Sequence, residues 1–179
     1  MRPARRVALA VQRASRAAHI PPDAVLRRWA RAALAREAVV TVRYVAETEG
    51  RRLNRAFRGR DYATNVLTFA YGSRPLSGDI VVCAPVGARE ARAPGKPVAP
   101  PHPRSPATPA GLAPEAGAQG KPVAAHHAHL LVHGLLPLAG LDRRGGAEAA
   151  RMEARERRIL AALGFPDPYA PVTKASGRL

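Results

Sequence analysis

Four of the six histidines lie within one short segment, and they are the side chains best suited to chemistry. They are His126, His127, His129 and His133. Imidazole binds divalent metals and transfers protons near neutral pH. His126, His129 and His133 follow the spacing i, i+3, i+7, which places them on one face of a helix. The outer two would be about 10 Å apart along the helix axis, so these three are not expected to share one metal ion.

A second feature is the run Arg58-Gly59-Arg60-Asp61, which is predicted to form a turn. The chain has 29 Lys and Arg against 13 Asp and Glu, a net charge of +16, and only three of those cations are Lys. Such a basic excess favours a nucleic-acid partner, because neutralised phosphates release counterions. The alternative is compositional drift in a GC-rich genome, with Arg58 and Arg60 as ordinary exposed arginines.

Hydrophobic periodicity predicts the elements that must position these groups. Short β-branched runs predict strands, and apolar residues at helical spacing predict helices. In the helix that precedes Arg58, Leu53 and Phe57 are expected to point toward the core. Thr64 and Asn65 are expected to bond the local backbone where the next strand begins. The predicted strands are 7–12, 39–45, 66–69 and 78–83, and the predicted helices are 23–36, 48–57, 85–92, 124–136 and 147–163.

These elements predict an α+β fold: one domain over residues 1–170, with a mixed sheet of about four strands packed by about five helices. A proline-rich segment, 94–122, interrupts the domain with nine of the 18 prolines and is predicted to be a disordered insertion. It contains the sequence Gly-Lys-Pro-Val-Ala at 95–99, which recurs at 120–124. Residues 171–179 are predicted to be a loose tail.

Composition excludes several classes of protein. Cys83 is the single cysteine, so a disulfide framework and a cysteine-based zinc module are excluded, and a reducing cytoplasm is favoured. No apolar run approaches the ~20 residues that span a bilayer. The apolar run Val7–Val11 is too short for a secretory signal. We therefore expect a cytoplasmic protein without a membrane partner.

Several segments together resemble the YbeY family, the bacterial zinc-dependent endoribonucleases of ribosomal RNA maturation. The family signature runs His-Gly-x-Leu-His-x-x-Gly-Tyr-Asp-His, and residues 133–143 follow it in part. The block from Leu53 to Phe69 is similar to the family's Leu-Asn…Arg-Gly-Lys-Asp…Thr-Asn-Val-Leu-Ser-Phe. Further matches lie at Gly78–Pro85, at Met152-Glu153…Glu156 and at Leu163–Tyr169.

The resemblance implies a zinc site made by three histidines of the signature, with an open position for water. Here His133 keeps the first ligand position, but Pro137 and Arg143 occupy the other two. Proline has no donor atom for a metal, and its ring disturbs the helix next to His133. Arginine stays protonated and repels a dication. His133 is thus the one family ligand that remains, and zinc binding there is expected to be impaired. His126 and His129 then have structural or RNA-facing roles.

The resemblance also assigns Arg58, beside Arg60, to a cleft that meets an RNA phosphate, with His133 and Arg58 as the catalytic candidates. The implied partners are ribosomal RNA and the small ribosomal subunit, and no DNA partner is expected. Two functions follow. The first is a metal-dependent endoribonuclease in which a zinc-activated water attacks the phosphodiester. The second is an inactive relative that only binds the RNA or the subunit. A decaying gene copy is a third alternative.

Overall fold

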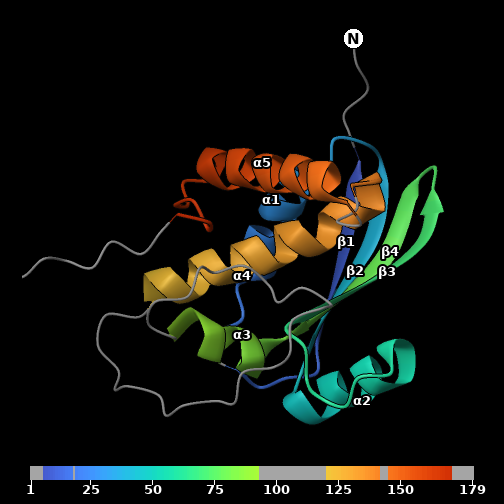
Figure 1. The fold of residues 1–179 in the computed structure, drawn as a ribbon, viewed down its shortest axis with the longest axis vertical. Helices are drawn as coiled ribbons and strands as arrows, with labels where there is room; N and C mark the ends of the chain where they lie inside the picture. Colours follow the sequence, from blue (N-terminus) through green and yellow to red (C-terminus); the bar gives the residue numbers. More distant parts are fainter. Residues whose placement is uncertain (1–5, 18, 93–119, 142–144, 171–179) are drawn as a thin grey trace, which may run out of the picture.

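The computed structural model describes residues 6–17, 19–92, 120–141 and 145–170, with side chains from Val123 onward in the third range. A four-stranded sheet carries helices on both of its faces (Figure 1). The strands are β1 Val7–Arg13, β2 Ala38–Val45, β3 Val66–Ser73 and β4 Leu76–Cys83. The helices are α1 Asp23–Ala33, α2 Glu47–Arg58, α3 Ala84–Arg92, α4 Gly120–Leu135, the 3₁₀ helix η1 Leu136–Ala139 and α5 Gly146–Ala162.

The sheet is mixed, with the strand order β1-β2-β4-β3. Strands β1, β2 and β4 are parallel, while β3 runs antiparallel to β4 and lies at the edge of the sheet. The parallel pairs need crossover connections, and α1 and α2 lie within them. The β3–β4 pair is a hairpin, whose ladder shifts register between Ala70 and Gly72.

Alternation along β3 and β4 separates two hydrophobic clusters. Val66, Ile80 and Val82 point into the main core with residues of α1, α4 and α5. Leu67, Val81 and Cys83 point to the opposite face, where half-buried Leu53 of α2 packs against their cluster. Helix α4 and helix α2 therefore cover opposite faces of the sheet (Figure 1).

The predicted fold class is confirmed: the structure is α+β, with four strands and five α-helices in its described part. Strands β3 and β4 are longer than predicted, because the hairpin carries pairing through Ala70–Ser73, where Tyr71 is the one residue type that favours a strand. Phe57 was predicted to face the core, but its side chain is 64% exposed. It lies in the last turn of α2, and its ring contacts the ring of Phe69.

The predicted insertion, 94–122, lies outside the described residues except at its end, where residues 120–122 form the first turn of α4. Helix α4 therefore begins four residues before its predicted start at Ala124, and the disorder of the insertion stays a prediction. The predicted tail, 171–179, also lies outside the described residues. Among the helices that the structure describes, none has the length and apolar character to cross a membrane.

Candidate active site

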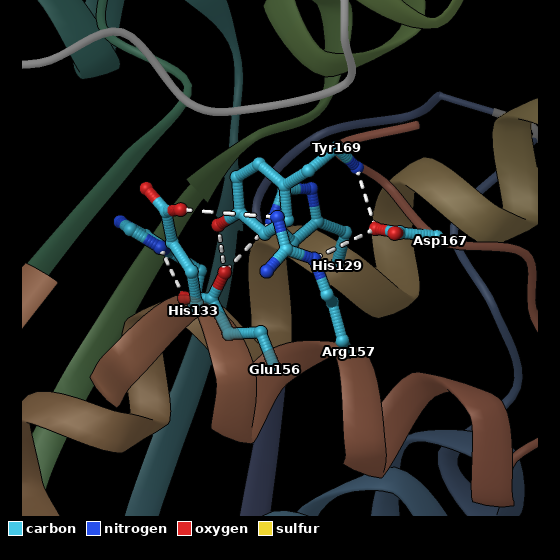
Figure 2. Close-up of polar contacts among 7 residues, drawn as sticks. His129, His133, Glu156, Arg157, Asp167 and Tyr169 are labelled. Atoms are coloured by element: carbon cyan, nitrogen blue, oxygen red, sulfur yellow. Dashed lines mark hydrogen bonds and ion pairs between the residues drawn. The ribbon is translucent and has the colours of Figure 1, made fainter. Parts of the chain in front are cut away.

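A buried carboxylate on α5 joins two of the histidines of α4. Residues four apart on a helix lie one turn apart on the same face, so His129 and His133 both face α5, where they meet Glu156. His129 Nε2 lies 3.2 Å from Glu156 Oε2, and His133 Nδ1 lies 2.7 Å from Glu156 Oε1. The Tyr169 hydroxyl also donates to Glu156 Oε2. Figure 2 shows the four side chains pointing toward one another.

The segment that follows α5 carries Tyr169 into this cluster and is held there by polar contacts (Figure 2). Asp167 accepts a hydrogen bond from Arg157 Nε at 3.3 Å and another from the Tyr169 backbone N–H at 2.9 Å. The Arg157 guanidinium lies 4.9 Å from the centroid of the Tyr169 ring, within the range of a cation–π contact. The motif Phe-Pro-Asp-Pro-Tyr at 165–169 thus fixes the tyrosine that completes the cluster.

The electrostatics of the cluster favour an ionised Glu156. Burial alone would raise the pKa of this carboxyl, but the hydrogen bonds from His129 and His133 outweigh burial and hold the pKa well below its usual range. Glu156 and His129 are fully buried, while the His133 side chain is 15% exposed. His133 is therefore the member of the cluster that faces outward, with its ring oriented by the carboxylate behind it.

The donor set of the cluster fits a divalent metal. One ligand atom each from His129, His133 and Glu156 lies within 4.8 Å of the others. Two imidazoles and one carboxylate are the protein ligands of a known class of catalytic zinc sites, which keep a fourth position for water. This set was not predicted from the sequence: His129 was expected to have a structural or RNA-facing role, and Glu156 was given no role. The i, i+4 spacing of the histidines and the acid on a following helix were the available signals.

Pro137, at the second family ligand position, does not fit a metal. The α-helical part of the segment ends at Leu135, one residue earlier than predicted, and Pro137 lies in the 3₁₀ helix η1. The chain then turns at Gly140, whose φ of 86° is in the left-handed region. Proline cannot donate a backbone hydrogen bond to the carbonyl of His133, so it favours the end of the α-helix there. Arg143, at the third position, lies outside the described residues.

Strand β3 lies directly against the helix at His133. Thr68 Oγ1 donates a hydrogen bond to the Gly134 carbonyl at 2.9 Å. A Cβ at Gly134 would approach Ile80 Cγ2 to 2.9 Å and Val66 Cγ2 to 3.1 Å. Glycine beside His133 therefore lets α4 approach the sheet closely, so β3 forms one wall next to this histidine.

Arg58 and Arg60 lie on another part of the molecule. Arg58 ends α2 and is exposed, and Arg60 is half-buried in the segment that follows. Helix α2 covers the opposite face of the sheet from α4, which carries His133. Within the described part of the chain, no hydrogen bond or ion pair joins Arg58 to His133. Their catalytic and RNA-binding roles stay predictions.

His126 has a partner of its own, so the three histidines on one face do not share a site. Its Nε2 lies 3.1 Å from Glu90 Oε2 of α3, and the same oxygen accepts a hydrogen bond from Asn65 Nδ2 at 2.9 Å. This corrects the prediction that the Asn65 side chain bonds the local backbone. The amide instead reaches α3, because Asn65 is buried where β3 begins. His126 therefore has a structural role, which is one of the two roles, structural or RNA-facing, that were predicted for it.

Comparisons with known proteins match most of the chain. A family model described as Endoribonuclease YbeY matches residues 13–100 and 109–164. The endoribonuclease YbeY of Aromatoleum aromaticum is 50% identical over 169 residues, 92% of this chain and 94% of the relative. That of Azoarcus sp. is 46% identical and covers 84% of this chain, which spans 53% of that relative. A solution structure from Thermotoga maritima has a TM-score of 0.49 at 18% identity, covering 93% of this chain and 99% of the other.

Proposed function

Because this chain belongs to the endoribonuclease YbeY family, we propose that it hydrolyses phosphodiester bonds of single-stranded ribosomal RNA at a site built around His133. The cluster of His129, His133 and Glu156 is the observation that supports this proposal, because it offers a metal three donor atoms. The partners proposed with it are ribosomal RNA and the small ribosomal subunit, in the bacterial cytoplasm. The net charge of +16 supports an RNA partner.

The metal we propose is zinc, held by His129, His133 and Glu156 in place of the family's three signature histidines. The signature set does not fit, because Pro137 has no donor atom and Arg143 carries a positive charge. A bound zinc lowers the pKa of its water and polarises the phosphodiester. Glu156 keeps the His133 ring oriented toward the outside of the cluster. Arg58 is proposed to bind a phosphate oxygen of the RNA through its exposed guanidinium.

A second function, RNA binding without cleavage, is favoured by one specific observation. Pro137 occupies a family ligand position and ends the α-helix beside His133. Glu156 is also already engaged by three hydrogen bonds, and a metal must compete with them. In this alternative the histidine–carboxylate cluster only stabilises the packing of α4 against α5, and the chain retains the basic surface.

Metal analysis and RNA cleavage on the same purified protein distinguish the two functions. We expect about one zinc per chain, and cleavage of single-stranded RNA that a chelator abolishes and added zinc restores. His133→Ala should lose both zinc and cleavage. Arg31→Ala, which removes an exposed arginine of α1, is the control and should keep both. Protein that binds RNA but contains no zinc and does not cleave would establish the second function instead.

A further inference from the structure

Three aromatic side chains gather on the face of the sheet that α2 covers. Phe57 is 64% exposed and Tyr71 is 67% exposed. The ring of Phe57 packs edge-on against the ring of Phe69, with 5.0 Å between their centroids. Large apolar side chains with this exposure have a cost in water, so their grouping at one place indicates a contact surface.

The ladder between β3 and β4 places the third ring beside the first two. Phe69 lies directly opposite Asp79, so their side chains share one face of the sheet. The Tyr71 hydroxyl donates to Asp79 Oδ2 at 2.8 Å, which places the Tyr71 side chain on the face of the sheet that carries Phe69 and Asp79. Phe57, Phe69 and Tyr71 therefore form one surface, which we name the aromatic platform.

The charges beside the platform are mainly positive. Arg52, Arg55 and Arg58 of α2 are exposed, and within the described residues none of them is in a salt bridge. Arg51, by contrast, is neutralised by Asp61 through two hydrogen bonds of 2.9 and 2.8 Å. Asp79 is the acidic group on the platform itself, and the Tyr71 hydroxyl bonds to it. The platform thus combines exposed aromatic rings with the guanidinium group of Arg58, which follows Phe57 directly in the chain.

We propose that the aromatic platform binds single-stranded RNA, with unpaired bases stacked on Phe57 and Tyr71 and an adjacent phosphate held by Arg58. This inference rests on the proposed function and locates where the substrate strand is held. Every base has a π face, so stacking on aromatic side chains binds a single strand without reading its sequence, while arginines bind its backbone. A duplex cannot use the platform, because its bases already stack on one another.

The position of the platform at the edge of the sheet also supports single-stranded RNA as its ligand. Thr68 and Phe69 are neighbours in β3, yet Thr68 bonds to Gly134 beside His133 while Phe69 belongs to the platform. Strand β3 is at the edge of the sheet, and no further strand of the described structure pairs with it. An RNA strand that crosses this edge passes from the platform to His133 over the width of one β-strand.

Binding of a short, unstructured, fluorescein-labelled single-stranded RNA tests the platform, with the full chain and a chelator present so that the probe stays intact. Phe57→Ala should weaken binding about ten-fold, the usual effect of losing one stacked base. Phe57→Tyr should keep wild-type affinity, and Phe57→Leu should resemble alanine, because stacking needs a ring. Tyr71→Ala should weaken binding to a similar extent.

Salt dependence separates stacking from charge. Phe57→Ala should leave the slope of log K against log salt unchanged, whereas Arg58→Ala should reduce it by about 0.7, the value for one phosphate contact on a single strand. Arg31→Ala is the matched control for lost charge on the opposite face and should bind as wild type. Circular dichroism confirms that each variant folds, and Phe57 is exposed enough for its alanine variant to do so.

The outcomes distinguish the platform from the proposed function. Wild-type protein that binds the RNA, together with a folded Phe57→Ala variant of equal affinity, overturns the platform and leaves the function intact. Wild-type protein that does not bind single-stranded RNA overturns both. A Phe57→Ala variant with unchanged RNA affinity that loses self-association in sedimentation would assign the platform to a second copy of this chain instead.

Discussion

At the scale of single residues, Glu156 determines the geometry of the candidate site. Its carboxylate accepts hydrogen bonds from His129, His133 and Tyr169, which belong to one helix and to the segment after α5. Hydrogen bonds to a buried charged group are stronger than those between neutral groups. Removing the negative charge of Glu156 leaves these three donors with a weaker acceptor. The free energy of unfolding then falls, because each donor has lost its contact with water without gaining a strong hydrogen bond.

Glu156→Gln is expected to destabilise the metal-free protein by about 3 kcal/mol, since breaking a buried network by changing one member has a cost of this order. The amide keeps the shape of the side chain but replaces an acceptor oxygen with a donor NH₂ that faces an imidazole or a hydroxyl. Urea unfolding in the presence of a chelator measures the change. Glu148→Gln changes an exposed carboxylate on the same helix and should shift the midpoint little. Equal midpoints for the two variants would contradict a structural role for Glu156.

His127 shows the opposite situation, a buried histidine without partners. Both of its ring nitrogens lack a hydrogen-bond partner in the described structure. The ring of His19 lies 5.2 Å away and that of Tyr44 5.8 Å away. Burial, with smaller contributions from His19 and His126, lowers the pKa of His127 to about 3. The folded protein therefore contains neutral imidazole at this position.

Replacing His127 with leucine should stabilise the protein, because two unpartnered polar atoms leave the core. Below pH 6.5 the unfolded chain binds a proton at this histidine and the folded chain does not, so wild-type stability falls as the pH decreases toward 3. The advantage of His127→Leu should then grow by on the order of 2 kcal/mol between pH 8 and pH 5. Urea midpoints at several pH values test this trend. An advantage that stays constant with pH would show that His127 binds a proton as readily in the folded protein as in the unfolded chain.

At the scale of elements, the local sequence pattern predicted where strands and helices form better than it predicted how they pack on one another. The strands and helices were predicted at nearly their observed places, because β-branched runs and apolar spacing are properties of the local sequence. The extension of β3 through Ser73 was missed, since pairing with β4 holds Ala70, Gly72 and Ser73, which have little strand preference of their own. The side chain of Phe57 was wrongly predicted to be buried, because helical spacing alone does not show where the sheet surface beneath α2 ends. Glu156 was missed because the packing of α5 on α4 is a tertiary contact.

The close approach of η1 to the β3–β4 hairpin gives a prediction at this scale. A Cβ at Gly78 would lie 2.4 Å from the Phe69 carbonyl oxygen and 2.6 Å from Leu138 Cδ2. The backbone oxygen cannot move aside without loss of the ladder, so Gly78→Ala should cost about 1–3 kcal/mol. Gly145→Ala is the control, because an added methyl there meets no atom within 4 Å. Thermal denaturation measures both, and an unchanged melting temperature for Gly78→Ala would show that η1 is not packed tightly on the sheet.

At the scale of the whole molecule, the chain belongs to the endoribonuclease YbeY family, while three positions of the signature have changed: Pro137 and Arg143 replace histidines and Leu141 replaces a tyrosine. The four-stranded sheet, the hydrogen bond from Thr68 to Gly134 and the left-handed turn at Gly140 form the surroundings of His133. Of the changed positions, Pro137 and Arg143 remove donor atoms that would surround a metal next to His133. The contacts described above do not use the Pro137 side chain, since the Gly140 N–H bonds to backbone carbonyls, that of Pro137 among them. We therefore expect the rest of the molecule to support a site once the donors return.

The double substitution Pro137→His and Arg143→His tests this in the full chain. It returns two imidazoles, removes a positive charge from the site and restores the backbone N–H that can bond to the His133 carbonyl. We expect zinc to bind more tightly than in the wild type, and chelator-sensitive cleavage of single-stranded RNA to increase, since three histidines and an open position are a common catalytic set. Pro137→His alone should extend α4 and raise helical content without the full gain in affinity. A double variant that binds zinc but cleaves no faster than wild type would show that the loss extends beyond the metal ligands, to the surface that holds the RNA.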